Sequence, residues 1–236
     1  MRPLPAVLVL ATVVAACTPV NERAGEAFTT DGEIIAMGGG DGGPANACLS
    51  CHGLDGAGDG VSTPRLAGLD AGYLQKQLGD YADGTRPDEV MGPIAKWLDD
   101  GDRRAVAAWY AGLPPPGGTR PVTPVPAIYL TGGCGSCHGP DGQGVGAGNP
   151  AISGQPAGYT LDQLRRWKRA ERRNDPRGVM ADAVADLTDV EMRAIAAWLE
   201  TVPAARPPDS AAASASAGAA AAARPAAFRG TRRPDR

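Results

Sequence analysis

Two copies of the motif Cys-x-x-Cys-His constrain this chain of 236 residues more than any other feature. The first copy reads CLSCHG from Cys48, and the second reads CGSCHG from Cys134. In both copies the histidine directly follows the second cysteine, and a glycine-rich loop follows the histidine. Any explanation of one motif must therefore apply to the other.

Three interpretations of the motif fit the sequence poorly. A structural zinc site needs about four nitrogen or sulfur ligands around one ion, whereas these cysteine pairs lie 86 residues apart at equivalent positions of a repeat. A redox dithiol of the thioredoxin type needs a βαβ context that the sequence lacks, and it gives the histidine no role. A disulfide within each motif would close a small, strained loop.

Covalent attachment of haem c gives every residue of the motif a role. The two thiols add to the porphyrin vinyl groups, and the adjacent histidine binds the iron. The macrocycle would also fill an interior for which the chain has few large side chains, because it contains only two Phe, four Trp and five Tyr. We therefore predict two covalently bound haem c groups. Their expected attachment residues are Cys48, Cys51, Cys134 and Cys137.

The motifs belong to two copies of a longer unit. At an offset of 86 residues, Tyr73 aligns with Tyr159, and PRLAGL at 64–69 aligns with PAISGQ at 150–155. After a three-residue insertion, MGPIAKWLDDGDRRAVAAWYAGL aligns with MADAVADLTDVEMRAIAAWLETV. Two copies of about 75 residues predict two homologous domains, since a solenoid needs more repeats.

We expect an all-α fold. The strongest helical patterns lie at 98–113 and 187–202, where apolar residues recur at helical spacing behind Asp or Thr capping candidates. Shorter candidates lie at 72–84, at 158–173 and before each motif, and no segment has a persuasive strand pattern. The expected boundaries are 32–113 for the first domain, 114–126 for a Pro-rich linker, 127–203 for the second domain and 204–236 for a disordered low-complexity tail.

Export is predicted by the amino-terminal sequence MRPLPAVLVLATVVAAC, in which one Arg precedes an apolar stretch and small residues. The stretch is too short to span a bilayer as a helix. VAAC resembles a bacterial lipobox, and Cys17 is the cysteine that the two motifs leave over. We expect a lipoprotein signal peptide at 1–16, lipidation of Cys17 and a flexible tether at 17–31; an ordinary signal peptide with an incidental cysteine is the alternative.

Methionine is the expected second axial ligand of each iron. Of the five methionines, only Met91 and Met180 occupy equivalent positions, 39 and 42 residues after the motif histidines. Met1 lies in the signal sequence, Met37 lies too close before the first motif, and Met192 lies in the middle of a predicted helix, where packing is its expected role. The expected axial ligands are His52, Met91, His138 and Met180.

A proline follows each motif histidine by 12 residues, at Pro64 and Pro150. A metal-bound imidazole usually donates its other N–H to a carbonyl, which fixes the orientation of the ring. Because a proline has a rigid backbone and no N–H of its own, we expect the two proline carbonyls to accept these hydrogen bonds. The alternative is an ordinary loop proline.

The formal net charge of −3 is unevenly distributed. The second unit contains the basic run LRRWKRAERRNDPRG at 164–178, where the first unit has the acidic LGDYADGTRPDEV at 78–90. The basic run has three interpretations: a solvated helix face, neutralisation of haem propionates, or docking of an acidic partner. No basic stripe of the nucleic-acid-binding kind is present, so we expect no nucleic-acid partner.

Each half resembles a class I cytochrome c domain, with Cys-x-x-Cys-His, a Gly-Asp-Gly loop, then Pro, Tyr, and a Met that precedes an Ala/Trp-rich final helix. The tandem resembles the dihaem cytochrome c4 family over about 32–202. This resemblance implies one haem on each of the two residue sets given above, and two compact domains whose haems face each other across a pseudo-twofold axis. The expected lipid anchor and the basic tail depart from the usual soluble form.

If both irons carry His and Met, no iron position is open to oxygen, peroxide or substrate, so we expect an electron carrier and not an enzyme. Methionine as the second iron ligand raises the reduction potential relative to a second histidine. We expect a periplasmic, lipid-anchored protein that takes electrons from a quinol–cytochrome c reductase or a periplasmic dehydrogenase and passes them to a membrane oxidase or a reductase. The alternatives are the cytochrome subunit of a heteromeric dehydrogenase for a sulfur compound or an alcohol and, less favoured, a dihaem peroxidase.

Overall fold

The computed structural model of the protein describes residues 31–117, 124–175 and 177–205. The predicted signal peptide, the lipidation site Cys17 and most of the low-complexity tail lie outside the described residues. Within the described ranges, no helix has the length and apolar character needed to cross a bilayer.

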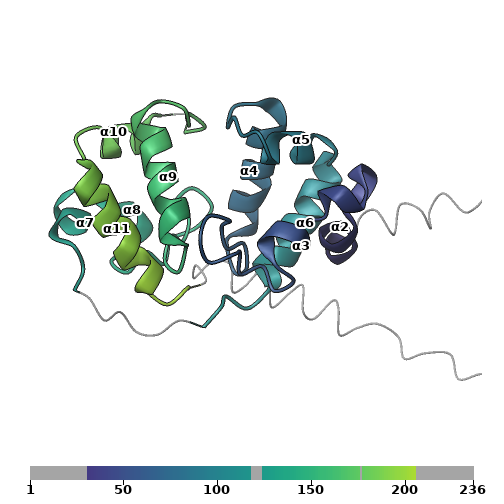
Figure 1. The fold of residues 1–236 in the computed structure, drawn as a ribbon, viewed down its shortest axis with the longest axis horizontal. Coiled ribbons are helices and arrows are strands. Elements are labelled where there is room, and N and C mark those ends of the chain that lie inside the picture. Colours follow the sequence, from purple (N-terminus) through teal and green to yellow (C-terminus); the bar gives the residue numbers. More distant parts are fainter. Residues whose placement is uncertain (1–30, 118–123, 176, 206–236) are drawn as a thin grey trace, which may run out of the picture.

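The described residues form two helical domains that lie side by side (Figure 1). The first domain contains α2 (Gly32–Gly38), two 3-10 turns (Gly40–Gly42 and Pro44–Asn46), α3 (Leu49–His52), α4 (Ala71–Asp83), α5 (Met91–Lys96) and α6 (Asp100–Gly112). The second contains α7 (Ala127–Thr131), α8 (Cys134–His138), α9 (Ala157–Lys168), α10 (Val179–Val184) and α11 (Asp189–Thr201). The described ranges contain no strand beyond an isolated bridge between Gly146 and Asn149, so the all-α prediction is confirmed.

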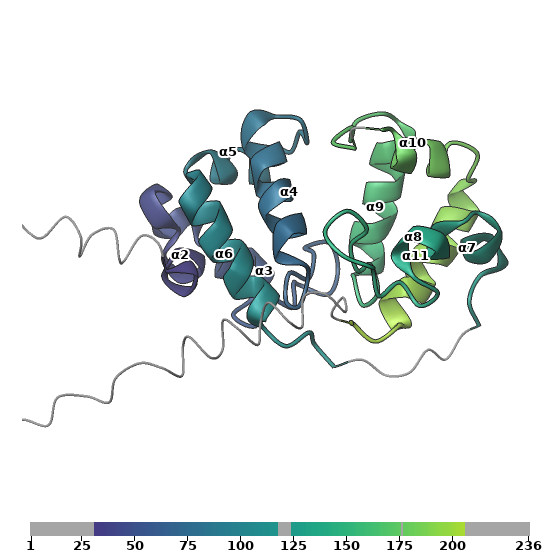
Figure 2. The same cartoon turned by 180° about the vertical axis from the view of Figure 1, so that it is seen from behind.

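The internal repeat is visible as a correspondence of helices between the domains. In each domain a long middle helix, α4 or α9, is followed by a short helix and then by a long final helix. The helices α4 and α9 face each other at the centre of the molecule (Figures 1 and 2). Equivalent helices of the two repeats therefore face each other at the boundary, and loop residues such as Arg65 and Gln155 also bond across it.

Both long final helices begin at the predicted caps. At the start of α6, the Asp99 carboxylate accepts from the backbone N–H of Asp102 at 2.8 Å, and the Asp102 carboxylate accepts from the N–H of Asp99 at 3.3 Å. Thr188 and Glu191 form the same reciprocal pair at the start of α11. Such capping boxes satisfy N–H groups that have no partner within the helix.

The helix expected at 158–173 is shorter than predicted, because α9 ends at Lys168. Ala170 adopts a left-handed conformation with φ of 56°, which a non-glycine residue rarely adopts and which stops a helix. After this turn the chain runs back toward α4, and Arg172 is buried between the domains. Contacts with the first domain therefore replace the last turn of the predicted helix.

Each domain has its own apolar core, in which the final helix packs against the helix that precedes the motif. Trp198 of α11 contacts Tyr129 of α7, with ring centroids 4.6 Å apart, and Met192 is buried in the same core. In the first domain α6 approaches α2 so closely that a Cβ on Gly32 would lie 2.9 Å from Cβ of Trp109. The predicted packing role of Met192 is confirmed.

Replacement of Trp198 tests the second core. Only 4% of this side chain is exposed, and we expect Trp198→Ala to lower the free energy of unfolding of the second domain by about 3–5 kcal/mol. Trp97→Ala is the control, because 57% of Trp97 is exposed, and its effect should stay within about 0.5 kcal/mol. Guanidinium denaturation of the haem-loaded protein measures the free energy of unfolding of both variants. Equal losses in the two variants would contradict the placement of Trp198 in the core.

Candidate haem sites

Each Cys-x-x-Cys-His motif forms one short helical turn. In the first motif the backbone N–H of His52 donates to the Cys48 carbonyl at 2.9 Å, closing the turn α3. In the second, Cys134 and His138 are the ends of α8. The four motif cysteines are not joined in disulfides. Because a cysteine pair and its histidine lie on one turn in each domain, the two motifs form separate sites.

The cysteine environment does not suit a redox dithiol. Burial raises the pKa of the Cys48 thiol to about 11, and burial also raises the pKa of Cys134. A reactive dithiol needs a cysteine whose pKa is lowered, because the thiolate is the nucleophile. The first cysteine of each motif is instead a protonated thiol in apolar surroundings, and both pack against their domain's core.

Both motif histidines are buried and point one ring nitrogen at a proline carbonyl. Nδ1 of His52 lies 2.9 Å from O of Pro64, and Nδ1 of His138 lies 2.8 Å from O of Pro150. With Nδ1–H donating to the carbonyl, Nε2 keeps its lone pair for a metal. Burial lowers the pKa of both imidazoles, which favours the neutral form that binds iron.

A glycine in the loop after each motif brings the proline segment close to the histidine. The N–H of Gly58 donates to the His52 carbonyl at 2.9 Å, and the N–H of Gly144 donates to the His138 carbonyl at 2.8 Å. Both glycines have positive φ, 82° and 75°. A Cβ on Gly144 would lie 2.4 Å from N of Ala151, and the first loop is equally tight. Only glycine fits where the two segments touch.

The two predicted methionine ligands occupy equivalent places at the starts of short helices. Met91 is the first residue of α5 and Met180 is the second residue of α10; both are half-buried. The backbone N–H of Met91 donates to the Asp88 carboxylate at 2.9 Å, and that of Met180 donates to the Asp175 carboxylate at 2.7 Å. An aspartate in the preceding loop therefore positions each methionine.

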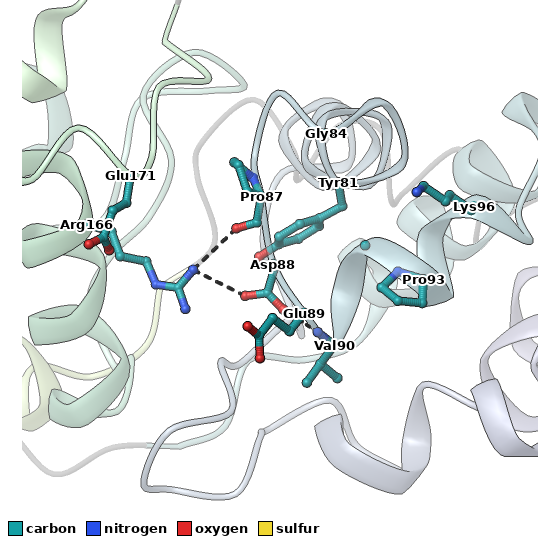
Figure 3. Close-up of a pocket in the computed structure, with 11 residues that line it drawn as sticks. Tyr81, Gly84, Pro87, Asp88, Glu89, Val90, Pro93, Lys96, Arg166 and Glu171 are labelled. Atoms are coloured by element: carbon teal, nitrogen blue, oxygen red, sulfur yellow. Dashed lines mark hydrogen bonds and ion pairs between the residues drawn. The ribbon is translucent and has the colours of Figure 1, made fainter.

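A cavity of about 670 Å³ lies beside α5 at the domain boundary (Figure 3). It is lined by Tyr81, Gly84, Pro87, Asp88, Glu89, Val90, Gly92, Pro93 and Lys96 of the first domain and by Arg166 and Glu171 of the second. Arg166 donates to the Pro87 carbonyl at 3.3 Å and lies 3.5 Å from the Asp88 carboxylate. Part of the basic run therefore pairs with the acidic segment of the first domain.

Four polar residues form a cluster between the domains that was not singled out from the sequence, although Arg172 belongs to the basic run. They form what we call the arginine–glutamine ring, which consists of Gln77, Arg86, Gln163 and Arg172. Arg86 donates to the side-chain oxygens of Gln77 at 2.9 Å and Gln163 at 2.7 Å. Arg172 donates to the same oxygens at 3.0 Å and 2.9 Å respectively. The signal was present, because the two glutamines and the two arginines repeat at the same offset of 86 residues.

The residues in each domain fit a haem c group. Each domain combines two unpaired thiols on one helical turn with a buried imidazole whose Nε2 is left for a metal. In the first domain the buried hydroxyl of Tyr110 has no hydrogen-bond partner among the described residues. Because buried polar atoms usually have such a partner, this hydroxyl is consistent with a bound group beside it.

Comparisons with known proteins agree with this geometry. A family model described as cytochrome c matches residues 44–113 and 122–203. The thiosulfate dehydrogenase electron acceptor of Stutzerimonas stutzeri (strain A1501) is 39% identical over 191 residues, which are 75% of this chain and 88% of that relative. Cytochrome c4 of Thiocapsa roseopersicina is 37% identical over 168 residues, covering 65% of this chain and 85% of the relative.

Two solved structures are similar in fold. Reduced recombinant cytochrome c4 from Pseudomonas stutzeri superposes with a TM-score of 0.58 at 28% identity, covering 66% of this chain and 93% of that one. Thiosulfate dehydrogenase (TsdBA) from Marichromatium purpuratum superposes with a TM-score of 0.62 at 35% identity, covering 75% of this chain. The matched region is 40% of that longer chain.

Replacement of Gly144 tests the loop that carries Pro150. In Gly144→Ala the new Cβ meets the Ala151 backbone at positive φ, so we expect a loss of about 1–3 kcal/mol in the free energy of unfolding of the second domain. The absorption spectrum of one haem of the two should change as well. Gly148→Ala is the control, because no heavy atom lies within 4 Å of its Cβ position. Equal stability of the two variants would show that the loop is not constrained there.

Proposed function

This chain belongs to the cytochrome c family, as a tandem dihaem protein of the cytochrome c4 type, and we propose that His and Met ligate both of its irons. The proposed pairs are His52 with Met91 and His138 with Met180. The proposed thioether attachments are Cys48 and Cys51 in the first domain and Cys134 and Cys137 in the second. The observation that carries this proposal is the buried imidazole of each motif, hydrogen-bonded through Nδ1 to a proline carbonyl.

Each residue set has a definite task in electron transfer. A haem iron gains and loses one electron when the group is bound. The Pro64 and Pro150 carbonyls hold the imidazoles in one orientation and one tautomer. Asp88 and Asp175 fix the starts of the helices that carry the methionines. Because a histidine and a methionine would both hold each haem iron, we propose that the protein has no catalytic site of its own.

We propose a thiosulfate dehydrogenase as the electron donor. This chain is 39% identical to a protein named as the electron acceptor of that enzyme, over 88% of the relative's length. A second such relative, from Thiomonas intermedia (strain K12), is 38% identical, and the TsdBA structure also contains a matching region. Catalysis on thiosulfate would then belong to another polypeptide, and this chain would receive single electrons.

A second candidate role is transfer from a quinol–cytochrome c reductase to a membrane oxidase or a reductase. The cytochrome c4 relatives support this role. Both roles place the protein in the periplasm, and we propose that a lipid on Cys17 holds it at the membrane, on the basis of the amino-terminal sequence. The two roles differ in the donor, which a reduction assay can identify.

The donor assay uses the oxidised, haem-loaded protein with a thiosulfate dehydrogenase and thiosulfate. We expect the absorption of reduced haem to grow until two electrons per molecule have been accepted, because both haems are one-electron centres. Omitting thiosulfate is the control. Rapid reduction by a quinol–cytochrome c reductase with quinol, and none by the dehydrogenase, would replace the first role by the second.

Carbon monoxide tests the ligand assignment, since it binds only to a ferrous haem with an open position. We expect the reduced parent protein to show no spectral shift. Met91→Ala should open one iron, so that half of the haem responds, and Met180→Ala should do the same for the other half. Met192→Leu is the matched control, because Met192 is a buried core residue. A shift in the parent protein would mean that one iron is open and would favour a catalytic role.

A further inference from the structure

Three buried arginines at the domain boundary have no acidic partner among the described residues, Arg65, Arg86 and Arg172, and the last two share the arginine–glutamine ring. Arg86 is 4% exposed and Arg172 is 8% exposed. Within the part of the chain that the structure describes, no carboxylate forms an ion pair with either guanidinium. Burial of a charge is costly unless an opposite charge compensates it. The site therefore holds two positive charges that the described side chains leave uncompensated.

The contacts of both guanidiniums are with neutral groups. Besides the two glutamines of the arginine–glutamine ring, Arg86 donates to the Tyr159 hydroxyl at 3.0 Å, and Arg172 donates to the Asn174 side-chain oxygen at 3.0 Å. Asp80 accepts a hydrogen bond from that asparagine and forms an ion pair with Lys76. It therefore already has a cationic partner.

Aromatic rings hold the guanidiniums from one side. Arg86 stacks over Tyr81, 4.5 Å from the ring centroid, and Arg172 stacks over Trp167 at 4.8 Å. The two pairs occupy equivalent positions at the offset of 86 residues, with Tyr81 in the place of Trp167. The aromatic rings fix the plane of each guanidinium, and the glutamines bond to some of its N–H groups. Arginines held in this way are suited to bind carboxylates.

The missing counter-charge matches what a haem c group carries, namely two propionate carboxylates. Each domain contributes one arginine, and the chain continues from each arginine to the methionine proposed as iron ligand, five residues on in the first domain and eight in the second. We propose that Arg86 and Arg172 form one carboxylate site shared by both domains, which binds propionates of both haems and raises both reduction potentials. This inference rests on the proposed function, because it requires a haem in each domain.

The hydrogen bonds of the arginine–glutamine ring connect both domains. Each guanidinium donates to one glutamine of its own domain and to one of the other domain, where α4 and α9 face each other (Figure 1). A cation near an iron favours the reduced state, because reduction adds a negative charge. Loss of either arginine should therefore lower the potential of the haem in the other domain as well as in its own.

The test is a redox titration of the full haem-loaded chain, followed by absorption, for the parent, Arg86→Gln and Arg172→Gln. Both one-electron steps should shift to lower potential in each variant. Arg86→Lys, which keeps the charge, should retain higher potentials than Arg86→Gln and covers the case in which the glutamine variant does not fold. Arg193→Gln is the control, because it removes an exposed arginine paired with Asp189, and it should move neither step.

Three results would overturn the proposal. Unchanged reduction potentials in Arg86→Gln at full haem content would mean that the arginine–glutamine ring only joins the two domains. A shift confined to one step would mean that the site is not shared. A dependence of the parent's potentials on added inorganic phosphate would assign the site to a free anion. If the parent does not titrate as two haems, the proposed function itself fails, so the two failures are distinguishable.

Discussion

The hydrogen bond from each buried histidine to a proline carbonyl is the contact on which both domains depend. It fixes the ring so that Nε2 is the nitrogen left for iron, and it does so at 2.9 Å in one domain and 2.8 Å in the other. The glycine at positive φ in the preceding loop makes this approach possible, because a side chain there would strike the proline segment. Motif, loop and proline thus form one structural unit in each repeat.

Buried polar groups bond across the domain boundary. The Gln155 side chain accepts from the backbone N–H of Arg65 and donates to its carbonyl, both at 2.9 Å. The Arg65 guanidinium donates to the Ser153 carbonyl across the same boundary. Such contacts specify one alignment of the two domains, because a shifted alignment would leave buried polar groups unpaired. The alignment matters for an electron carrier, since it sets the relation between the two haem sites.

The predictions that succeeded concern local chemistry. The capping boxes of α6 and α11 were readable because a cap and its partner are three residues apart. The packing role of Met192 followed from its place in the middle of a helix. The early end of α9 at Lys168 was missed, because the basic residues after it look helical by composition. The burial of Arg172 against the first domain involves a contact with Gln77, 95 residues away, that no local pattern encodes.

The sequence by itself determined the two motifs, the repeat and the final helices, because each rests on residues that interact within a few positions or recur at a constant offset. Only the tertiary structure decided how the repeats face each other and what their charges contact. The basic run and the acidic segment looked like separate surfaces in the sequence, yet Arg166 lies against Asp88. The equivalent positions of Arg86 and Arg172 in the repeat were present in the chain, but only the placement of the two domains side by side brings the two guanidiniums onto the same pair of glutamines.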